Sequence, residues 1–342
     1  MAHSVTLMPG GQSFQVDDNE TVLTAALRQG ITLPYGCRDG ACGACKGKIV
    51  EGEVDYGDSQ VSALTDADRK QGLALFCCAR PTDDLRVECQ EVGGLSGIPV
   101  KTMPARIQRM RRLAPDVMAI ELKLPTSERL QFLAGQYVDI LLKDGRRRSF
   151  SIANAPHDDE FLHLHIRHVP GGVFTEQVFA TMKERDILRI NGPLGTFHLR
   201  DDSTKPVVLV AGGTGFAPIK AIVEQAIHGG SRRPMTLYWG ARTPTDLYMN
   251  ELPMSWADAH AHIRYVPVVS DATATASWAG RTGLVHHAVM EDFPDLSGHQ
   301  VYACGAPAMI DAARSDFAAR CGLQSGDFFA DSFSFSADAP AG

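Results

Sequence analysis

The sequence predicts three successive domains: a small mixed α+β domain over residues 1–92, an antiparallel β-barrel over 102–203 and a parallel α/β domain over 204–342. A length of 342 residues suits two to three domains of roughly 100–200 residues each. Turn-forming glycines and a proline cluster over Glu91–Lys101, which is typical of a linker. From Lys205 onward, alternating apolar runs give way to continuous apolar strands separated by helical periodicity, which indicates a parallel sheet.

Composition bounds the partners and the location. Apolar residues make up 44% of the chain and charged residues 21%, so ordinary folded cores are expected. Residues 1–97 hold 8 Lys+Arg against 14 Asp+Glu, a net charge of −6 out of −7 for the whole chain. The negative charge of this segment can steer a basic partner surface toward it, or it can be an ordinary solvated surface. The acidity of the chain disfavours nucleic acid as a partner. Without an apolar run of membrane-spanning length or a signal pattern, we expect a cytoplasmic protein with no membrane partner.

The first domain begins with a predicted hairpin. Val5–Leu7 and Phe14–Val16 are short apolar runs on either side of a Gly-Gly turn. Asp18 is the expected N-cap of a following helix, and Gly30 is expected to end that helix. Two further strands are expected, at Lys48–Val50 and Leu85–Val87.

Four cysteines have the spacing of a plant-type [2Fe–2S] site. Cys37, Cys42 and Cys45 have four and then two residues between them, and Cys77 follows after 31 more. The intervening residues are mostly glycine and alanine, which let the backbone wrap closely around sulfur. A zinc site or disulfide pairs are the alternatives. Zinc usually takes paired short cysteine hairpins, and a disulfide framework does not suit a cytoplasmic chain of this size.

The second domain is predicted from alternating strands such as Ile120–Leu124 and Leu162–Ile166. In the latter run His163, His165 and Arg167 occupy the face opposite the apolar residues. Two histidines on one strand suggest a metal pair, but too few ligands surround them. We therefore expect this face to be solvated or to line a ligand.

Two motifs of the barrel are candidate binding segments. Arg148–Ser151, reading Arg-Ser-Phe-Ser, lies on a predicted strand, where a basic strand end is also common as solvated surface. Gly171–Thr175 carries two glycines, and Thr175 is expected to begin a helix whose N–H groups meet a phosphate. Ordinary turn chemistry is the alternative for both motifs.

The third domain opens with a strand–glycine loop–helix unit. Val207–Val210 is a continuous apolar run, as expected of a strand buried on both faces, and Gly212–Gly215 follows at once. The loop resembles a dinucleotide fingerprint, but Pro218 replaces its last glycine and is expected to be the first helical residue. No acidic residue ends the next strand, and Arg242 stands there instead. Cys304, after a later strand, faces a bound nicotinamide or is a small buried hydrophobe.

Together these motifs resemble those of a known family over essentially the whole chain. The chain is similar to a plant-type ferredoxin fused to a ferredoxin–NADP reductase-like module, the architecture of the reductase components of bacterial ring-hydroxylating dioxygenases and multicomponent monooxygenases. It is also similar to reductases of CDP-6-deoxyglucoseen, a deoxysugar intermediate. The resemblance implies a β-grasp ferredoxin domain, an antiparallel β-barrel flavin domain and a parallel α/β nucleotide-binding domain.

The resemblance also implies residue roles. Arg148 would contact the FAD pyrophosphate, Phe150 would stack on the flavin in place of the family's tyrosine, and Ser151 would lie near flavin N5. The implied FAD-binding set is Arg148, Ser149, Phe150, Ser151, His165, Gly171, Gly172, Val173 and Thr175. The implied nicotinamide-nucleotide set is Gly212, Gly213, Thr214, Gly215, Arg242, Cys304 and Gly305. The implied catalytic residues are Ser151, Cys304 and Phe333, although the chain continues past Phe333 where many relatives end.

The function implied is electron transfer from NADH or NADPH, through FAD and the [2Fe–2S] cluster, to an oxygenase component. FAD accepts a hydride as an electron pair and passes electrons singly to the cluster. A deoxysugar reductase is the rival within the same chemistry, and a redox-sensing module without turnover is the rival from another class. We expect NADH to be preferred, because the oxygenase reductases lean that way and Arg242 is a single cation on a loop tip.

Overall fold

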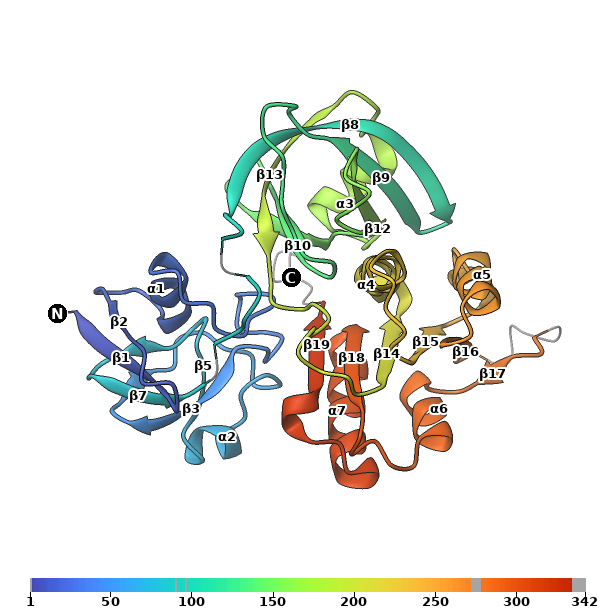
Figure 1. The fold of residues 1–342 in the computed structure, drawn as a ribbon. Coiled ribbons are helices and arrows are strands. Elements are labelled where there is room, and N and C mark those ends of the chain that lie inside the picture. Colours follow the sequence, from blue (N-terminus) through green and yellow to red (C-terminus); the bar gives the residue numbers. More distant parts are fainter. Residues whose placement is uncertain (1, 90, 96, 272–277, 334–342) are drawn as a thin grey trace. The chain divides into compact units, whose positions relative to one another are not determined.

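The computed structural model of the chain describes residues 2–89, 91–95, 97–271 and 278–333 (Figure 1). The tail beyond Phe333 lies outside the described residues. By its contacts the chain divides into two compact units, which are described separately. The first is Met1–Ile98 with Gly195–Phe197, and the second is Pro99–Leu194 with His198–Gly342. Within the part of the chain described, no helix is long and apolar enough to cross a membrane.

The first unit is a five-stranded mixed sheet in the order β2-β1-β7-β3-β5. β1 pairs antiparallel with β2 and parallel with β7, so the predicted hairpin and the two predicted later strands are confirmed. Apolar side chains such as Val5, Leu23 and Val87 are almost fully buried between the sheet and α1. Its elements are β1 (His3–Met8), β2 (Ser13–Val16), α1 (Val22–Arg28), β3 (Lys46–Glu51), β4 (Val54–Asp55), α2 (Asp66–Lys70), β5 (Leu73–Leu75), β6 (Arg80–Pro81) and β7 (Leu85–Glu88).

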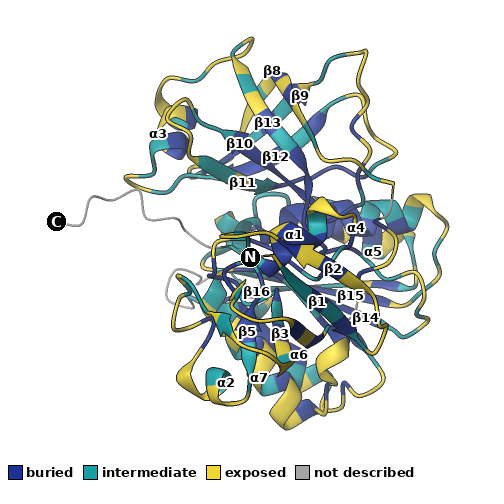
Figure 2. Ribbon diagram, turned by 90° about the vertical axis from the view of Figure 1, so that its left-hand side faces the viewer, coloured by how far each residue is buried: buried dark blue, intermediate teal, exposed yellow. Residues whose placement is uncertain are grey.

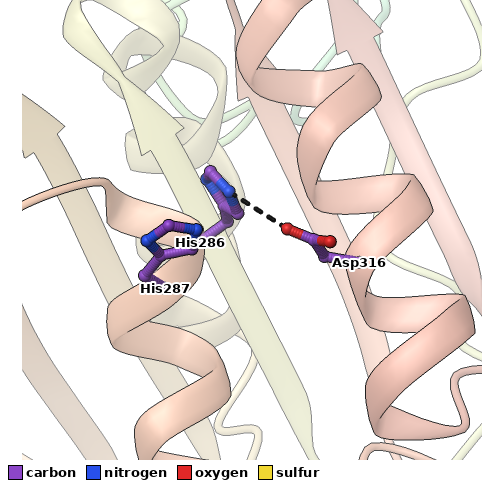
Figure 3. A group of neighbouring side chains, drawn as sticks. All are labelled: His286, His287 and Asp316. Carbon is purple, nitrogen blue, oxygen red and sulfur yellow. Dashed lines mark ion pairs between the residues drawn. The ribbon is translucent and has the colours of Figure 1, made fainter.

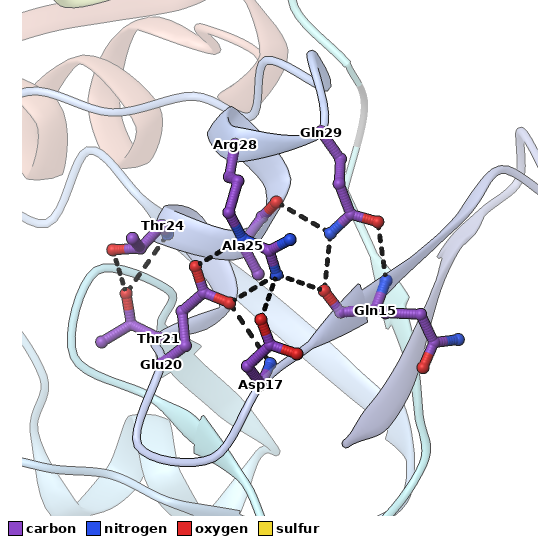
Figure 4. Close-up of polar contacts among 8 residues, drawn as sticks. All are labelled: Gln15, Asp17, Glu20, Thr21, Thr24, Ala25, Arg28 and Gln29. Carbon is purple, nitrogen blue, oxygen red and sulfur yellow. Dashed lines mark hydrogen bonds and ion pairs between the residues drawn. The ribbon is translucent and has the colours of Figure 1, made fainter.

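Helix α1 is capped by Thr21, so the expected N-cap at Asp18 is wrong. The Thr21 hydroxyl accepts a hydrogen bond from Thr24 N at 3.2 Å, which places the helix start three residues later than the acidic run suggests. Arg28, in the last turn, donates to Glu20 at 2.8 Å and to the Gln15 carbonyl at 3.2 Å (Figure 4). These bonds tie the end of α1 to β2 and orient the chain that leads into the cysteine loop.

The second unit begins with the predicted antiparallel barrel, in the strand order β11-β10-β13-β8-β9-β12. A bridge between Ile152 and Leu164 joins the two edges. The long strand β8 alternates buried and exposed residues over much of its length, and the buried ones fill the barrel (Figure 2). The elements are β8 (Lys101–Ala114), β9 (Val117–Lys123), β10 (Tyr137–Leu141), β11 (Arg147–Ser151), β12 (Leu162–Arg167), α3 (Val173–Ala180) and β13 (Ile187–Leu194).

The rest of the second unit is the predicted parallel α/β sheet, in the order β17-β16-β15-β14-β18-β19. Val208 and Val210 pack toward α6 and α7, while Phe216 of α4 stacks on Trp239 at 3.8 Å. The elements are β14 (Val207–Gly212), η1 (Gly213–Gly215), α4 (Phe216–His228), β15 (Met235–Ala241), η2 (Pro244–Asp246), α5 (Glu251–Ala259), β16 (Ile263–Val269), β17 (Arg281–Thr282), α6 (Val285–Asp292), β18 (Gln300–Gly305), α7 (Pro307–Cys321), η4 (Ser325–Asp327) and β19 (Phe328–Ser332).

A buried lysine links the barrel to the α/β sheet inside the second unit. Lys220 of α4 donates to the Ala153 carbonyl at 3.0 Å and forms an ion pair with Glu224 at 2.7 Å. The two partners compensate the buried charge of the Lys220 ammonium group, and loss of the Glu224 carboxylate would leave that charge unpaired. This link brings the carboxyl ends of β14 and β18 together with residues of the barrel.

Candidate functional site

The cysteine loop brings its thiols together in pairs. Cys37, Cys42 and Cys45 lie between α1 and β3, and Cys77 follows β5. The interaction with Cys42 lowers the pKa of Cys37 to about 6, and the interaction with Cys45 raises the pKa of Cys77. Backbone N–H groups point at sulfur, because Cys37 N donates to Cys42 Sγ and Asp39 N to Cys37 Sγ, both at 3.4 Å. Two pairs of neighbouring thiols, Cys37 with Cys42 and Cys45 with Cys77, with N–H donors to sulfur in the loop, suit a cluster with two iron atoms.

Two glycines shape this loop. Gly40 and Gly43 have φ of 68° and 71°, a conformation that other residues rarely adopt. A Cβ at Gly40 would also lie 2.7 Å from both Asp58 O and Cys78 Sγ. Cys78, which sequence reasoning treated only as a small hydrophobe, donates to Asp58 O at 3.2 Å and lies 3.7 Å from Cys77 Sγ. The loop is therefore packed tightly against a fifth thiol.

Strand β11 carries the Arg-Ser-Phe-Ser motif. Phe150 packs on the barrel core with its ring 5.4 Å from that of Phe174, while Arg148 donates to the Arg147 carbonyl at 2.7 Å. Ser149, on the alternate face, donates to the buried Asp139 carboxylate at 2.6 Å. The motif thus presents a guanidinium and an aromatic ring on one face of a strand.

Helix α3, which lies between β12 and β13 of the barrel in the sequence, follows the second predicted motif, Gly171–Thr175. The helix begins at Val173 with Gly172 as N-cap, so the expectation that Thr175 begins it is wrong. The Thr175 hydroxyl instead donates to the Val169 carbonyl at 3.0 Å. A Cβ at Gly172 would lie 2.8 Å from Thr175 Oγ1, and Gly171 has φ of 77°, so both glycines are needed here. A helix N-terminus of this kind suits a phosphate.

The glycine loop after β14 packs directly on the end of β18. A Cβ at Gly215 would overlap the Cys304 carbonyl, so only glycine fits there. Gly213 has φ of 54°, and its carbonyl accepts a hydrogen bond from Trp239 Nε1 at 2.9 Å. Gly213, Thr214 and Gly215 form a 3₁₀ turn that leads into α4 at Phe216. Pro218 is the third residue of α4, so the expectation that it is the first is wrong.

Arg167, at the end of β12, is a cation beside this loop that sequence reasoning did not assign to the nucleotide. Its Nη1 lies 2.8 Å from where a Cβ of Gly213 would be. Its Nε forms an ion pair with Asp116 at 3.1 Å, whereas its buried Nη2 has no hydrogen-bond partner among the described residues. A guanidinium with an unsatisfied donor at a glycine loop fits a bound phosphate group.

A carboxylate joins two of the expected catalytic residues. Asp331 of β19, which sequence reasoning left without a role, accepts hydrogen bonds from Ser151 Oγ at 3.4 Å and Cys304 Sγ at 3.9 Å. Burial and this carboxylate raise the pKa of the Cys304 thiol well above its usual value, so the thiol keeps its proton. Phe333 is held nearby, because its N–H donates to the Gly305 carbonyl at 2.9 Å. Gly305 also approaches Gly212, since its Cβ would lie 3.1 Å from Gly212 Cα.

His165 is buried, so of the two expectations for its strand face, exposure to solvent or lining of a ligand, the first does not hold for this residue. Its Nδ1 lies 3.1 Å from the hydroxyl of Tyr248, whose ring packs edge-on against that of Trp239. Burial, with Lys220 as the next cause, lowers the pKa of His165 to about 3. The imidazole is therefore neutral at neutral pH and packs among aromatic rings.

Arg242 follows β15 on an exposed turn. The nearby carboxylate of Asp246 accepts hydrogen bonds from the N–H and the hydroxyl of Thr243, both at 2.9 Å, and so caps η2. The Asp246 carboxylate therefore caps its own turn, and the end of β15 itself carries no acidic residue, as the sequence indicated.

Comparisons with known proteins agree with this architecture. The 2Fe-2S iron-sulfur cluster binding domain family matches residues 5–82, the oxidoreductase FAD-binding domain family 104–199 and the oxidoreductase NAD-binding domain family 209–315. Fold and sites thus define a flavin- and iron–sulfur-dependent oxidoreductase of the nicotinamide type.

Similar proteins extend over nearly the whole chain. The CDP-6-deoxy-L-threo-D-glycero-4-hexulose-3-dehydrase reductase of Yersinia pestis is 43% identical over 97% of this chain and 99% of its own. The phenol 2-monooxygenase reductase component DmpP of Pseudomonas sp. is 36% identical over 92% and 89%. The crystal structure of the Amycolatopsis cytochrome P450 reductase GcoB matches with a TM-score of 0.78 and 35% identity, over 97% and 98%. The chain belongs to this family of reductases with ferredoxin, FAD-binding and NAD-binding domains.

Proposed function

We propose that this reductase transfers electrons from NADH to an oxygenase component that hydroxylates an aromatic ring. The observation that carries the proposal is that one chain holds all three cofactor domains and is similar, over nearly its full length, to a monooxygenase reductase component. When bound, FAD would supply two-electron chemistry toward the nicotinamide, and the cluster would supply one-electron chemistry toward the acceptor. We place the protein in the cytoplasm, in keeping with its sequence.

Each cofactor has its own set of proposed binding residues. Arg148 and the first N–H groups of α3 hold the FAD phosphates, and Phe150 packs against the flavin ring. Ser151 orients the flavin and Cys304 contacts the nicotinamide, while Asp331 holds both side chains. The four cysteines, Cys37, Cys42, Cys45 and Cys77, hold the cluster. Preorganised dipoles and charges of this kind fix the orientation of the reacting atoms before the hydride moves.

The glycine loop and Arg167 hold the nucleotide. Gly212–Gly215 lets the backbone approach the pyrophosphate, and α4 favours its negative charge at the helix N-terminus. Arg167 supplies a charge-assisted hydrogen bond from its buried guanidinium. The domain limits that we propose, 1–92, 102–203 and 204–342, fall between strands, apart from β8, which begins at Lys101.

A second candidate acceptor is a dehydrase that acts on a nucleotide-linked 6-deoxyhexulose. The reductase of such a dehydrase is 43% identical to this chain, against 36% for the phenol monooxygenase component. Both acceptors would receive single electrons from the cluster, so the same proposed cofactor-binding residues suit either acceptor. The difference lies in the surface that docks the acceptor.

The acceptor assignment is tested by reconstitution. Purified reductase is mixed with NADH and, separately, with a purified aromatic-ring oxygenase or a purified nucleotide-sugar dehydrase with its substrate. Our reading expects product from the oxygenase and none from the dehydrase beyond the reductase-free control. Product from the dehydrase alone would transfer the assignment to the second candidate. NADH oxidation with ferricyanide as artificial acceptor shows turnover by itself and separates an enzyme from a redox sensor.

A further inference from the structure

Helices α6 and α7 bring together two histidines and an aspartate that have no role in the electron path proposed above. His286 and His287 lie in the first turn of α6, and Asp316 projects from α7 toward them (Figure 3). Their nitrogen and oxygen ligand atoms all lie within 4.8 Å of one another. Of the described residues, this is the one group of three or more potential metal ligands at such a spacing.

The spacing of the first pair already matches that of metal ligands. His286 Nε2 lies 3.3 Å from Asp316 Oδ2. A tetrahedral ion with bonds of about 2.0–2.2 Å separates neighbouring ligand atoms by roughly 3.3–3.6 Å. The His287 ring lies next to His286, with ring centroids 4.3 Å apart, and its side chain is exposed.

The chemistry of the three side chains fits one class of ion. The His286 side chain is only 6% exposed, so its imidazole is held between the two helices. Two imidazole nitrogens and a carboxylate oxygen are ligands that suit zinc and similar divalent transition metals rather than magnesium or calcium. A hydrogen bond from His286 to Asp316 explains that pair alone, but it leaves the adjacent second imidazole without a role.

We propose that His286, His287 and Asp316 bind one divalent transition metal ion, zinc in particular, with water in the fourth position. The ion joins α6 to α7. Since α7 connects β18 to β19, the ion stabilises the half of the sheet that carries Cys304 and Asp331. The inference does not depend on the identity of the electron acceptor.

The test uses the full chain loaded with FAD and its iron–sulfur cluster. The protein is washed with chelator and dialysed against micromolar zinc chloride. Bound zinc and iron are then counted together by atomic emission, and the melting temperature is recorded with and without zinc. We expect one zinc ion per chain, no loss of iron and a raised melting temperature.

Two variants test the proposed ligands and a third is the control. His287→Gln changes an exposed side chain and should lower zinc affinity by at least about tenfold, as should Asp316→Asn. His260→Gln, from a histidine pair with ring centroids 5.8 Å apart, should keep the wild-type affinity. Unchanged ferricyanide turnover in each variant shows that it is folded. Zinc uptake that equals iron loss, equal zinc affinity in wild type and His287→Gln, or no uptake by the wild type would each overturn the proposal.

Discussion

The hydroxyl of Ser151 donates a hydrogen bond to the carboxylate of Asp331 across 3.4 Å, although 180 positions separate the two residues in the sequence. The same carboxylate oxygen lies 3.9 Å from Cys304 Sγ. The barrel and the α/β sheet therefore meet at one buried carboxyl group. If a nicotinamide binds beside Cys304 as proposed, this carboxylate would stabilise the positive charge that the ring gains on losing a hydride.

Asp331→Asn should slow flavin reduction by NADH. The amide keeps the size of the side chain but removes its charge, so we expect the rate constant to fall at least about tenfold, or about 1.4 kcal/mol in the barrier. Anaerobic stopped-flow measurement of flavin bleaching reads this step directly. Asp295→Asn, at an exposed loop position, is the matched control and should keep the wild-type rate. An Asp331→Asn rate equal to wild type would remove the carboxylate from the reaction.

Arg148→Ala should weaken FAD retention. A guanidinium paired with phosphate makes a charge-assisted hydrogen bond, whose loss costs on the order of 2 kcal/mol, or roughly thirtyfold in affinity. The FAD dissociation constant of deflavinated and reloaded protein measures the effect. Arg146→Ala, at the neighbouring hairpin where Arg146 pairs with Asp144 at 2.6 Å, should leave FAD affinity unchanged. Equal losses in both variants would argue for a general effect of charge.

Cys42→Ser should separate the two halves of the electron path. Loss of a thiolate ligand removes the cluster, so electron output to a protein acceptor should stop while NADH still reduces the flavin. Iron and labile sulfide content report the cluster, and reduction of the acceptor reports the output. Cys89→Ser, a cysteine outside the loop, should retain both. Normal reduction of the protein acceptor by Cys42→Ser would show that electrons bypass the cluster.

Arg242→Ala should scarcely change nucleotide preference. The side chain is an exposed single cation on a turn, so we expect NADH to be preferred by the wild type and the ratio of kcat/KM values to persist. Arg167→Ala, by contrast, should raise KM for NADH and NADPH alike, because the pyrophosphate is common to both. A wild-type preference for NADPH that disappears in Arg242→Ala would make this arginine the clamp for a 2′-phosphate.

The buried His165 should make the second unit sensitive to acid. Its pKa is lowered to about 3 in the folded chain from 6.5, so the unfolded chain binds the proton more readily between these values. Its contribution to stability is complete above pH 6.5 and is lost as the pH falls toward 3. We expect the melting temperature of His165→Gln to fall less than that of wild type between pH 7.5 and 5. His260→Gln should keep the wild-type slope, and parallel curves for His165→Gln and wild type would refute the assignment.

Local signals in the sequence predicted much of the fold. The cysteine spacing, the continuous strand Val207–Val210 and the glycine loop each depend on neighbours along the chain, and the architecture that they indicated is confirmed. Helix starts were less accurate, because Thr21 competed with Asp18 as a cap and only the backbone geometry decides between them. Capping residues of similar type within a few positions cannot be ranked from pattern alone.

The long-range contacts of the site were beyond the sequence. Asp331 stands in a motif in which only Phe333 has a predicted role, and Arg167 is one charge on a strand face that was predicted to be solvated or to line a ligand. Their roles appear only when β19 lies beside β18 and when β12 meets the glycine loop. The burial of His165 could not be predicted for the same reason, since Tyr248, which contacts it, lies 83 positions away in the sequence. Alternation assigns a face to a residue, but it does not say what packs on that face.

The contact between Gly215 and the Cys304 carbonyl has a consequence for engineering coenzyme preference. Because a Cβ at Gly215 would overlap that carbonyl, a substitution in the glycine loop shifts the end of β18 and the thiol that it carries. If Cys304 contacts the nicotinamide as proposed, a substitution at Gly215 would alter nucleotide affinity and hydride-transfer rate together. Libraries aimed at the exposed turn around Arg242 avoid that coupling.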